Sequence, residues 1–358
     1  MTKHGRASVL FLSLIGSAAI GNAAQIYDLG TLGGRTSHAS GVNSSGQVVG
    51  YSDLSPFVYH AFLYQGGTLQ DLGTLGGEKS MAFAVNSAGY AVGWSLDSTI
   101  GSGRSFEYAN GTMSEVAGSN RESATAINDK GEVVGTGGGL LSVGLGYLYS
   151  GGGITYIPGD SNPNSINNNT EVVGQLAGRA FYYYAGTAYS IGGLGSISSS
   201  ATAINDREQI VGWFSQNSIF DHHAFLYQLG SVTALGTLNG DTDSEALAIS
   251  QDGHIVGWSG DSGGRTTTAF MDYHNVMTDL NTFLPTNSGW HLDSATGITD
   301  SGLIVGNGRL NGGDVHAFLL DLSAASPSTP DPAATPEPGT WAMLLAGTAV
   351  IGLRRRIR

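Results

Sequence analysis

The stretch "ATAINDKGEVVG", residues 124–135, indicates the fold because its pattern occurs seven times along the chain. The other copies cover residues 39–50, 82–93, 164–174, 201–212, 246–257 and 295–306. Neighbouring copies end on glycines that lie 38 to 49 residues apart. A repeat of this length is typical of architectures in which each unit packs against the next.

Each copy has the pattern of a β-hairpin. Apolar residues flank a four-residue turn such as Asn128-Asp129-Lys130-Gly131. Asn and Asp suit the first turn positions, and glycine at the fourth can adopt positive φ. Copies four and five carry Thr170 and Glu208 in place of this glycine, so we expect their turns to differ.

Two further strands follow each hairpin, as in "HAFLY" at 60–64 and "LQDLG" at 69–73. Four short strands in about 40 residues is the period of a β-propeller blade. The last copy lacks its fourth strand, and a matching strand, Ile26 to Leu29, precedes the first copy. We expect that strand to pair with the strand around 316–320 and close the ring. The sequence therefore predicts an all-β, seven-bladed β-propeller over residues 25–322, rather than a solenoid or a sandwich.

Residues 1–23 have the composition of a secretory signal peptide. Lys3 and Arg6 precede an apolar run over 7–20, and small residues lead up to Ala23, where we expect cleavage. The alternative is a transmembrane helix, but the run is shorter than the roughly 20 residues that a span needs.

The C-terminal segment has three parts. A Ser/Pro/Ala linker over 323–335, which we expect to be disordered, is followed by Pro336, Glu337 and Pro338. An apolar run over 339–353 then ends at Arg354, Arg355 and Arg356, which stay on the cytoplasmic side of a membrane. Its length is marginal for a permanent span and suits a temporary anchor.

Residues 336–358 resemble the PEP-CTERM sorting signal of Gram-negative bacteria. The resemblance implies Sec export, a transmembrane helix that anchors the chain briefly in the inner membrane, and cleavage by an exosortase near Pro336–Pro338. The protein would then reach the cell surface or the extracellular space, in an organism that makes exopolysaccharide. The alternative is an ordinary membrane anchor.

The phrase "HAF" occurs at 60–62, 223–225 and 316–318, and "DLGTLGG" at 28–34 and 71–77. These phrases resemble the extracellular HAF-repeat family, and the resemblance covers most of 26–322. It implies a repeat and an extracellular location, but it supplies no catalytic residues.

Composition limits the possible chemistry. The chain has 358 residues and no cysteine, which excludes disulfides and thiolate metal sites. Its formal net charge is −13, although six of its Lys and Arg residues lie in the two terminal segments. Phosphate backbones would repel such a chain, so we expect no nucleic-acid partner.

Three motifs suggest chemistry only weakly. "GDSGG" at 260–264 would make Ser262 a protease nucleophile, but no matching histidine motif accompanies it. The histidines of the third strands belong to different blades, so we expect hydrogen bonding rather than metal binding. Asp241 and Asp243 are the best candidates for a calcium site, although ordinary solvated charge is the favoured explanation for them. We expect no other metal or cofactor.

Aromatic residues follow the closing glycine in four copies. They are Tyr51, Trp94, Trp213 and Trp258. Strand alternation favours packing of these rings between blades. The alternative is that they are stacking platforms for the rings of a polysaccharide.

We therefore expect an exported, non-enzymatic structural or binding module that contacts exopolysaccharide or a surface protein through repeated weak contacts. The alternative is a secreted polysaccharide hydrolase or lyase on a propeller scaffold. That activity would require carboxylates that converge in one pocket.

Overall fold

The computed structural model describes residues 24–116, 123–137, 145–193, 195–238, 240–261 and 266–323. The predicted signal peptide with Ala23, nearly all of the linker, Pro336–Pro338, the apolar run and Arg354–Arg356 lie outside these ranges. Ser262 of the "GDSGG" motif does too. Within the described ranges, no helix has the length and apolar character needed to cross a membrane.

The described residues form 28 strands and one short 3₁₀ helix, η1 (Leu280–Phe283). Blades 1 and 2 contain β2 (Ser37–Val42), β3 (Val48–Ser55), β4 (Val58–Gln65), β5 (Thr68–Gly73), β6 (Ser80–Val85), β7 (Ala91–Asp97), β8 (Ser102–Ala109) and β9 (Thr112–Glu115). Blades 3 and 4 contain β10 (Ser123–Ile127), β11 (Val133–Gly137), β12 (Leu145–Ser150), β13 (Gly153–Ile157), β14 (Ser161–Ile166), β15 (Val172–Leu176), β16 (Arg179–Tyr184) and β17 (Thr187–Ser190). Blades 5 and 6 contain β18 (Ser198–Ile204), β19 (Ile210–Ser215), β20 (His223–Gln228), β21 (Ser231–Gly236), β22 (Asp243–Ile249), β23 (Ile255–Gly260), β24 (Thr267–Tyr273) and β25 (Val276–Asp279). Blade 7 contains β26 (Trp290–Ile298), β27 (Leu303–Leu310), β28 (Val315–Asp321) and β1 (Gln25–Asp28).

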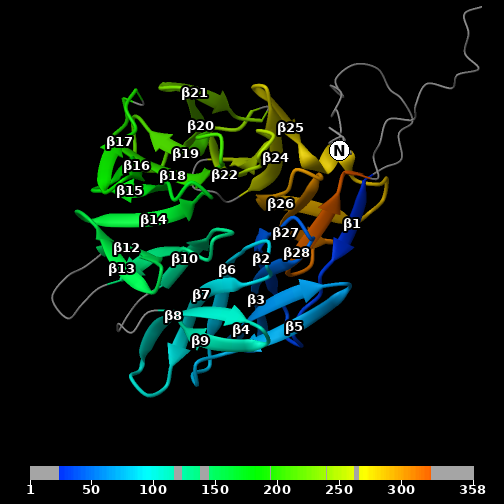
Figure 1. Ribbon diagram of the computed structural model, residues 1–358. Helices are drawn as coiled ribbons and strands as arrows, with labels where there is room; N and C mark the ends of the chain where they lie inside the picture. The colour runs from blue at the N-terminus through cyan, green and yellow to red at the C-terminus, as the bar shows by residue number, and fades with distance from the viewer. Residues whose placement is uncertain are drawn as a thin grey trace, which may run out of the picture. The chain divides into compact units, whose positions relative to one another are not determined.

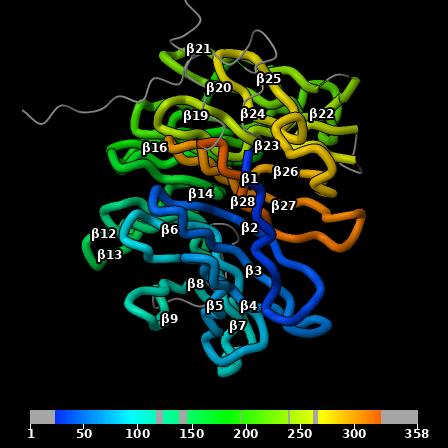
Figure 2. Tube along the Cα trace, turned by 90° about the vertical axis from the view of Figure 1, so that its right-hand side faces the viewer, coloured from blue at the N-terminus to red at the C-terminus, as the bar shows by residue number. Residues whose placement is uncertain are grey.

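These strands build seven four-stranded antiparallel sheets around a common centre (Figure 1). The prediction of a seven-bladed propeller with four strands per blade is therefore confirmed. β1 pairs with β28, so that Ile26 lies opposite Leu320 and Asp28 opposite Phe318. Figure 2 shows this N-terminal strand, in blue, beside the orange β28.

The closing glycine of each repeat allows the first two strands of a blade to approach closely. A Cβ atom on Gly50 would lie 1.9 Å from the carbonyl oxygen of His38 and 2.9 Å from the ring of Phe62. The other six closing glycines have the same kind of contact, at 1.9–2.1 Å from a carbonyl oxygen. A β-bulge in the first strand causes this approach, because the ladder shifts register there.

The aromatic residue of the third strand fills the core of every blade. Six blades have a phenylalanine at this position and blade 3 has a tyrosine, all 0% exposed: Phe62, Phe106, Tyr147, Phe181, Phe225, Phe270 and Phe318. This burial accounts for the "AF" of the repeated phrase, since each of these aromatic residues pairs with the closing glycine of its own blade.

The expectation that turns four and five differ from the others was wrong. Gly46, Gly89 and Gly131 have φ values of 76°, 81° and 77°, while Thr170 and Glu208 have φ values of 66° and 59°. The backbone N–H of residue 170 donates to the carbonyl of Asn167, just as that of Gly131 donates to Asn128. Thr170 and Glu208 therefore adopt a left-handed conformation that normally favours glycine.

Antiparallel pairing gives the propeller two distinct faces. We call the side with the turns between first and second strands, such as 43–47, the turn face. The turns between third and fourth strands lie on the same side. The opposite side carries the connections between blades, such as 74–79, and we call it the connector face.

Candidate functional site

Asparagine side chains link consecutive blades on the turn face. The Nδ2 of Asn128, the first turn residue of its repeat, donates to the backbone carbonyl of Asn167 in the next blade over 3.0 Å. Four other junctions repeat this bond, through Asn43 to Asn86, Asn86 to Asn128, Asn167 to Asn205 and Asn205 to Ser250. We call these five bonds the asparagine ladder. It links six of the seven turns around the centre, from the turn of Asn43 to the turn of Ser250.

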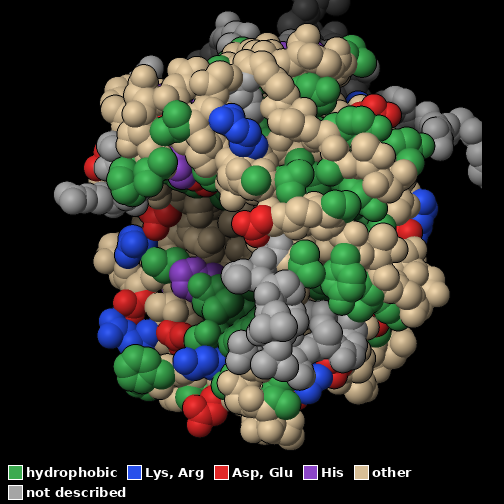
Figure 3. Space-filling model, turned by 90° about the vertical axis from the view of Figure 1, so that its left-hand side faces the viewer, with side chains coloured by type: hydrophobic (Ala, Val, Ile, Leu, Met, Phe, Trp, Pro, Cys, Tyr) green, Lys and Arg blue, Asp and Glu red, His purple; other side chains and the backbone are tan. Residues whose placement is uncertain are grey.

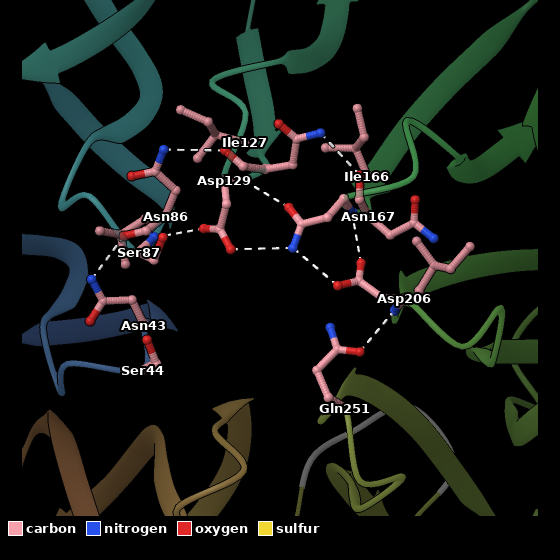
Figure 4. Close-up of a pocket in the computed structure, with 14 residues that line it drawn as sticks. Asn43, Ser44, Asn86, Ser87, Ile127, Asp129, Ile166, Asn167, Asp206 and Gln251 are labelled. Carbon is pink, nitrogen blue, oxygen red and sulfur yellow. Dashed lines mark hydrogen bonds between the residues drawn. The ribbon is translucent and has the colours of Figure 1, made fainter. Parts of the chain in front are cut away.

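A pocket of about 220 Å³ opens between these turns (Figure 4). Apolar side chains that precede the asparagines form its floor, namely Ile127, Ile166 and Ile204, each 7% exposed, together with the half-buried Val85. The second turn residues form its rim, and they are Ser44, Ser87, Asp129, Asn168, Asp206 and Gln251. The pocket therefore combines an apolar floor with a rim of hydroxyl, amide and carboxylate groups.

The rim is ordered by a second set of bonds between blades. The backbone N–H of Asp129 donates to Asn168 Oδ1 over 2.9 Å, and that of Asn168 donates to Asp206 Oδ1 over 2.7 Å. The Nδ2 of Asn168 donates to both Asp129 Oδ2, at 3.2 Å, and Asp206 Oδ2, at 3.1 Å. Asn168 thus lies between the carboxylates of Asp129 and Asp206 and donates to both, and Figure 4 labels these two aspartates.

These bonds favour the charged form of Asp129. Burial alone would raise the pKa of its carboxyl, but hydrogen bonds from Ser87 and Asn168 outweigh burial and lower that pKa. The group is therefore ionised at neutral pH and accepts hydrogen bonds only. An ionised acceptor of this kind suits the binding of hydroxyl groups better than it suits proton donation.

The pocket has the chemistry to bind a neutral ligand that is rich in hydroxyl groups. Its rim offers acceptors and amide donors in fixed positions, and its floor offers apolar surface. None of the described residues that line it is basic, so it offers no countercharge to an anion. On the side drawn in Figure 3, Lys and Arg side chains are scattered and form no continuous basic patch.

The four aromatic residues that follow closing glycines are half-buried and lie away from this pocket. Tyr51 stacks on His38 with ring centres 4.7 Å apart, and Trp213 stacks on His222 at 4.1 Å. The Nε1 of Trp258 donates to Glu245 over 3.3 Å, and a Cβ on Gly103 would meet the indole of Trp94. These contacts lie within single blades, where we expected packing between blades.

Of the two candidate calcium ligands, Asp241 lies in the connection between blades 5 and 6, and Asp243 is the first residue of β22. The hydroxyl of Ser259 donates to Asp241 Oδ2 over 2.8 Å, and Asp243 is buried. Asp243 Oδ1 is a buried acceptor without a hydrogen-bond partner, which a cation could satisfy. However, the described ranges bring together no group of three or more acidic or histidine side chains that could hold a metal. A calcium site at Asp241 and Asp243 stays a prediction.

Two of the three HAF histidines bind an aspartate of the fourth strand. The Nδ1 of His60 lies 2.9 Å from Asp71, and that of His316 lies 2.9 Å from Asp28. His223 instead packs beside Phe214 at 5.6 Å, because its fourth strand has Ala234 at the aspartate position. Hydrogen bonding therefore accounts for the two paired histidines, as the sequence predicted.

The asparagine ladder and the pocket were not predicted from the sequence. The signal was present, because the first turn residue is asparagine in five copies, while the second varies. Local turn preference explains asparagine without any contact to another blade, and so it concealed the ladder.

Comparison with known proteins supports the predicted sorting signal and the propeller fold. The model of the PEP-CTERM protein-sorting motif matches residues 334–358. This motif implies export and sorting to the cell envelope or surface, and exosortase handles such signals. No curated protein matches the chain.

Two solved structures share the propeller fold. Virginiamycin B lyase from Staphylococcus aureus aligns with a TM-score of 0.51 and 12% identity, over 84% of this chain and 99% of the lyase. Acylaminoacyl peptidase from Pyrococcus horikoshii aligns with a TM-score of 0.55 and 8% identity, over 80% of this chain and 51% of the peptidase. This chain therefore spans about half of the peptidase. Identities this low show a common fold and nothing about activity.

Proposed function

We propose that this chain is a non-enzymatic binding module that is exported and sorted by exosortase to the cell surface or the extracellular matrix. Its turn face would bind a neutral, hydroxyl-rich polymer such as the exopolysaccharide of its host. Membership of the HAF-repeat family and removal of a signal peptide after Ala23 belong to the same proposal.

The pocket on the turn face is the observation that carries this proposal. Asn168 fixes the carboxylates of Asp129 and Asp206 as acceptors, and apolar side chains lie beneath them. Sugar rings present hydroxyl groups at their edges and CH groups on their faces, so they match such a rim and floor. Sorting to the envelope or surface would bring the protein to such polymers.

We also infer that β1 closes the ring. The carbonyl of Ala317 in blade 7 accepts from Leu29, and the backbone N–H of Ala317 donates to Ser37 of blade 1. Arg35 donates to both carboxylate oxygens of Asp314 over 2.9 Å across the same junction. These contacts join the two ends of the repeat array, where the asparagine ladder does not run.

The test is binding of the purified exported protein to the host's exopolysaccharide, with and without calcium, while the length of the polymer is followed. We expect binding without shortening, and about tenfold weaker binding for Asn168→Ala. Asn217→Ala, on an exposed loop of the connector face, is the matched control and should bind like the unaltered protein. Equal binding by Asn168→Ala and the control would contradict the proposed site.

A polysaccharide hydrolase or lyase is the second candidate function. It is favoured by one observation, namely that Asp129 and Asp206 share a pocket and a hydrogen-bond donor. The same experiment separates the two functions. If the polymer is shortened by the unaltered protein but not by Asp129→Asn or Asp206→Asn, the protein is an enzyme rather than a binding module.

A further inference from the structure

Blade 4 carries a cluster of tyrosines on its two outer strands. Tyr182 and Tyr184 on β16 have ring centres 6.5 Å apart with planes inclined by 22°. Tyr189 on β17 lies 6.4 Å from Tyr182. Tyr184 is 50% exposed and Tyr189 is 53% exposed, so much of both rings contacts solvent. We call these three side chains the tyrosine patch.

The fold itself does not require tyrosines at these positions. Tyr182 pairs with Tyr189 across the two strands. Each of the other six blades has a pair of residues at the same register position. The corresponding pairs are Leu63–Gln70, Glu107–Ser114, Leu148–Thr155, Leu226–Thr233, Met271–Thr278 and Leu319–Tyr27. Six blades therefore form without a pair of aromatic rings here, and blade 4 departs from a pattern that is sufficient for folding.

A chain of hydrogen bonds joins the tyrosine patch to the central pocket. The hydroxyl of Tyr182 donates to Glu171 Oε1 over 2.6 Å, and Glu171 is only 4% exposed. The other oxygen of Glu171 accepts from Asn167, a member of the asparagine ladder. The next residue, Asn168, lines the pocket. The tyrosine patch and the part of the pocket rim that Asn168 supplies thus belong to the same blade and are fixed relative to each other.

Glu208 places a further negative charge near the patch, in a backbone conformation that normally favours glycine. Its φ is 59°, whereas five other repeats have glycine at this position. Burial, the hydrogen bond to Glu171 and the charges of Glu171 and Glu208 all raise the pKa of Tyr182. Glu208 therefore keeps an unfavourable backbone conformation beside an exposed patch, as residues at ligand-binding sites often do.

We propose that the tyrosine patch and Glu208 form a second subsite for a neutral polysaccharide, so that one chain runs from the central pocket outward over blade 4. Exposed tyrosine rings offer flat apolar surface with polar edges, against which the CH faces of sugars can stack. Glu208 is an acceptor for hydroxyl groups, and its charge disfavours an anionic polymer. This inference rests on the proposed function of the turn face, and it names the class of ligand.

The first test replaces Tyr184 and Tyr189 with alanine in the exported protein. The probes are the host's exopolysaccharide and three soluble neutral polymers, namely mixed-linkage β-glucan, xyloglucan and galactomannan. We expect affinity to fall at least about tenfold, because two stacking contacts are lost. Tyr156→Ala is the matched control, since Tyr156 is 52% exposed on β13 of blade 3 and lies outside the patch. Its affinity should stay within about twofold of the unaltered protein.

The second test uses Glu208→Gly. Glycine adopts positive φ without steric strain, so the variant should melt a few degrees higher than the unaltered protein. Its affinity for the polymer should fall about threefold, because one acceptor is lost. A higher melting temperature with unchanged affinity would assign Glu208 no part in binding.

The outcomes separate the subsite from the proposed function. If the unaltered protein binds none of the four polymers, both ideas fail. If it binds, and Asn168→Ala loses affinity while the tyrosine variant does not, the subsite alone is wrong.

A measurement on the unaltered protein covers the case in which the tyrosine variant does not fold. Tetranitromethane should modify Tyr184 and Tyr189 more slowly when polymer is bound, with no change at Tyr156. Equal rates at all three tyrosines, with and without bound polymer, would overturn the subsite.

Discussion

At the scale of single residues, two glycines of the same hairpin have different structural roles. A Cβ on Gly135 would lie 2.1 Å from the carbonyl oxygen of Ser123, whereas a Cβ on Gly131 would meet nothing within 4 Å. Gly131 is instead constrained by its φ of 77°. The closing glycine leaves room for the neighbouring strand to pack closely, and the turn glycine adopts the positive φ that the turn requires.

This difference predicts unequal costs of substitution by alanine. Gly135→Ala forces the first strand to shift and should lower the free energy of unfolding by about 3 kcal/mol. Gly131→Ala only strains the turn and should cost about 1 kcal/mol. Urea unfolding of both variants measures the two values. A larger loss for Gly131→Ala would contradict the assigned roles.

Asp272 is a buried carboxyl group in blade 6 with one unsatisfied oxygen. Burial is the main cause that raises its pKa from 3.8 to about 6, although a hydrogen bond from Asn275 opposes that change. Because the folded state keeps its proton up to higher pH than the unfolded state, the stability that Asp272 contributes falls as pH rises from about 4 to about 6.

Asp272→Asn should remove this pH dependence. Asparagine keeps an acceptor for the backbone N–H of Asn275 and cannot ionise. At pH 7 the variant should be more stable than the unaltered protein by up to about 3 kcal/mol, and at pH 4 the two should be similar. Denaturant melts across this pH range test the prediction. A difference that does not vary with pH would show that Asp272 ionises normally.

At the scale of structural elements, the turn between the first two strands does two jobs. Asn128 closes its own turn, because its Oδ1 accepts from the backbone N–H groups of Lys130 and Glu132. Its Nδ2 also reaches Asn167 of the next blade. One side chain therefore stabilises a hairpin and a junction between blades.

We predict that Asn128→Ala lowers the free energy of unfolding by about 2–3 kcal/mol, since buried partners in two blades lose hydrogen bonds. Asn217→Ala, on the exposed loop of the connector face, should change it by less than about 0.5 kcal/mol. The two values come from the same urea series. Similar values for both variants would mean that the ladder does not contribute to stability.

Strands and turns were predictable because their signals are local. Alternation of apolar residues, the four-residue turn and the closing glycine all act within one repeat. Thr170 and Glu208 misled the prediction, because composition alone suggested a different turn, whereas both turns keep the backbone hydrogen bond of the other five. The asparagine ladder could not be read from one repeat, since each bond crosses to another.

At the scale of the whole molecule, the count of repeats predicted the number of blades, and the missing fourth strand predicted the pairing of β1 with β28. The pocket was not predictable in this way. Its rim comes from six repeats, and the side chains there vary from Ser44 to Gln251. Only the arrangement around the centre shows that Asp129 and Asp206 share one amide.

The pairing of β1 gives a prediction for the complete ring. Deletion of residues 24–28 removes the four residue pairs with β28 and the contact between the Asp28 carboxylate and His316. We expect the free energy of unfolding to fall by about 3 kcal/mol. The exposed edge of β28 should also promote association of chains, which sedimentation would detect. A stable monomer after deletion would show that β1 is dispensable for closure.

The most direct test of the central claim is hydroxyl-radical footprinting of the exported protein, with and without the host's exopolysaccharide. The account predicts protection on the turn face only, at the turns around Asp129, Asn168 and Asp206 and at the tyrosine patch of blade 4. The connector face, with Phe57 and Phe220 as exposed reporters, should react equally in both samples. Protection of the connector face without protection of the turn face would contradict the account.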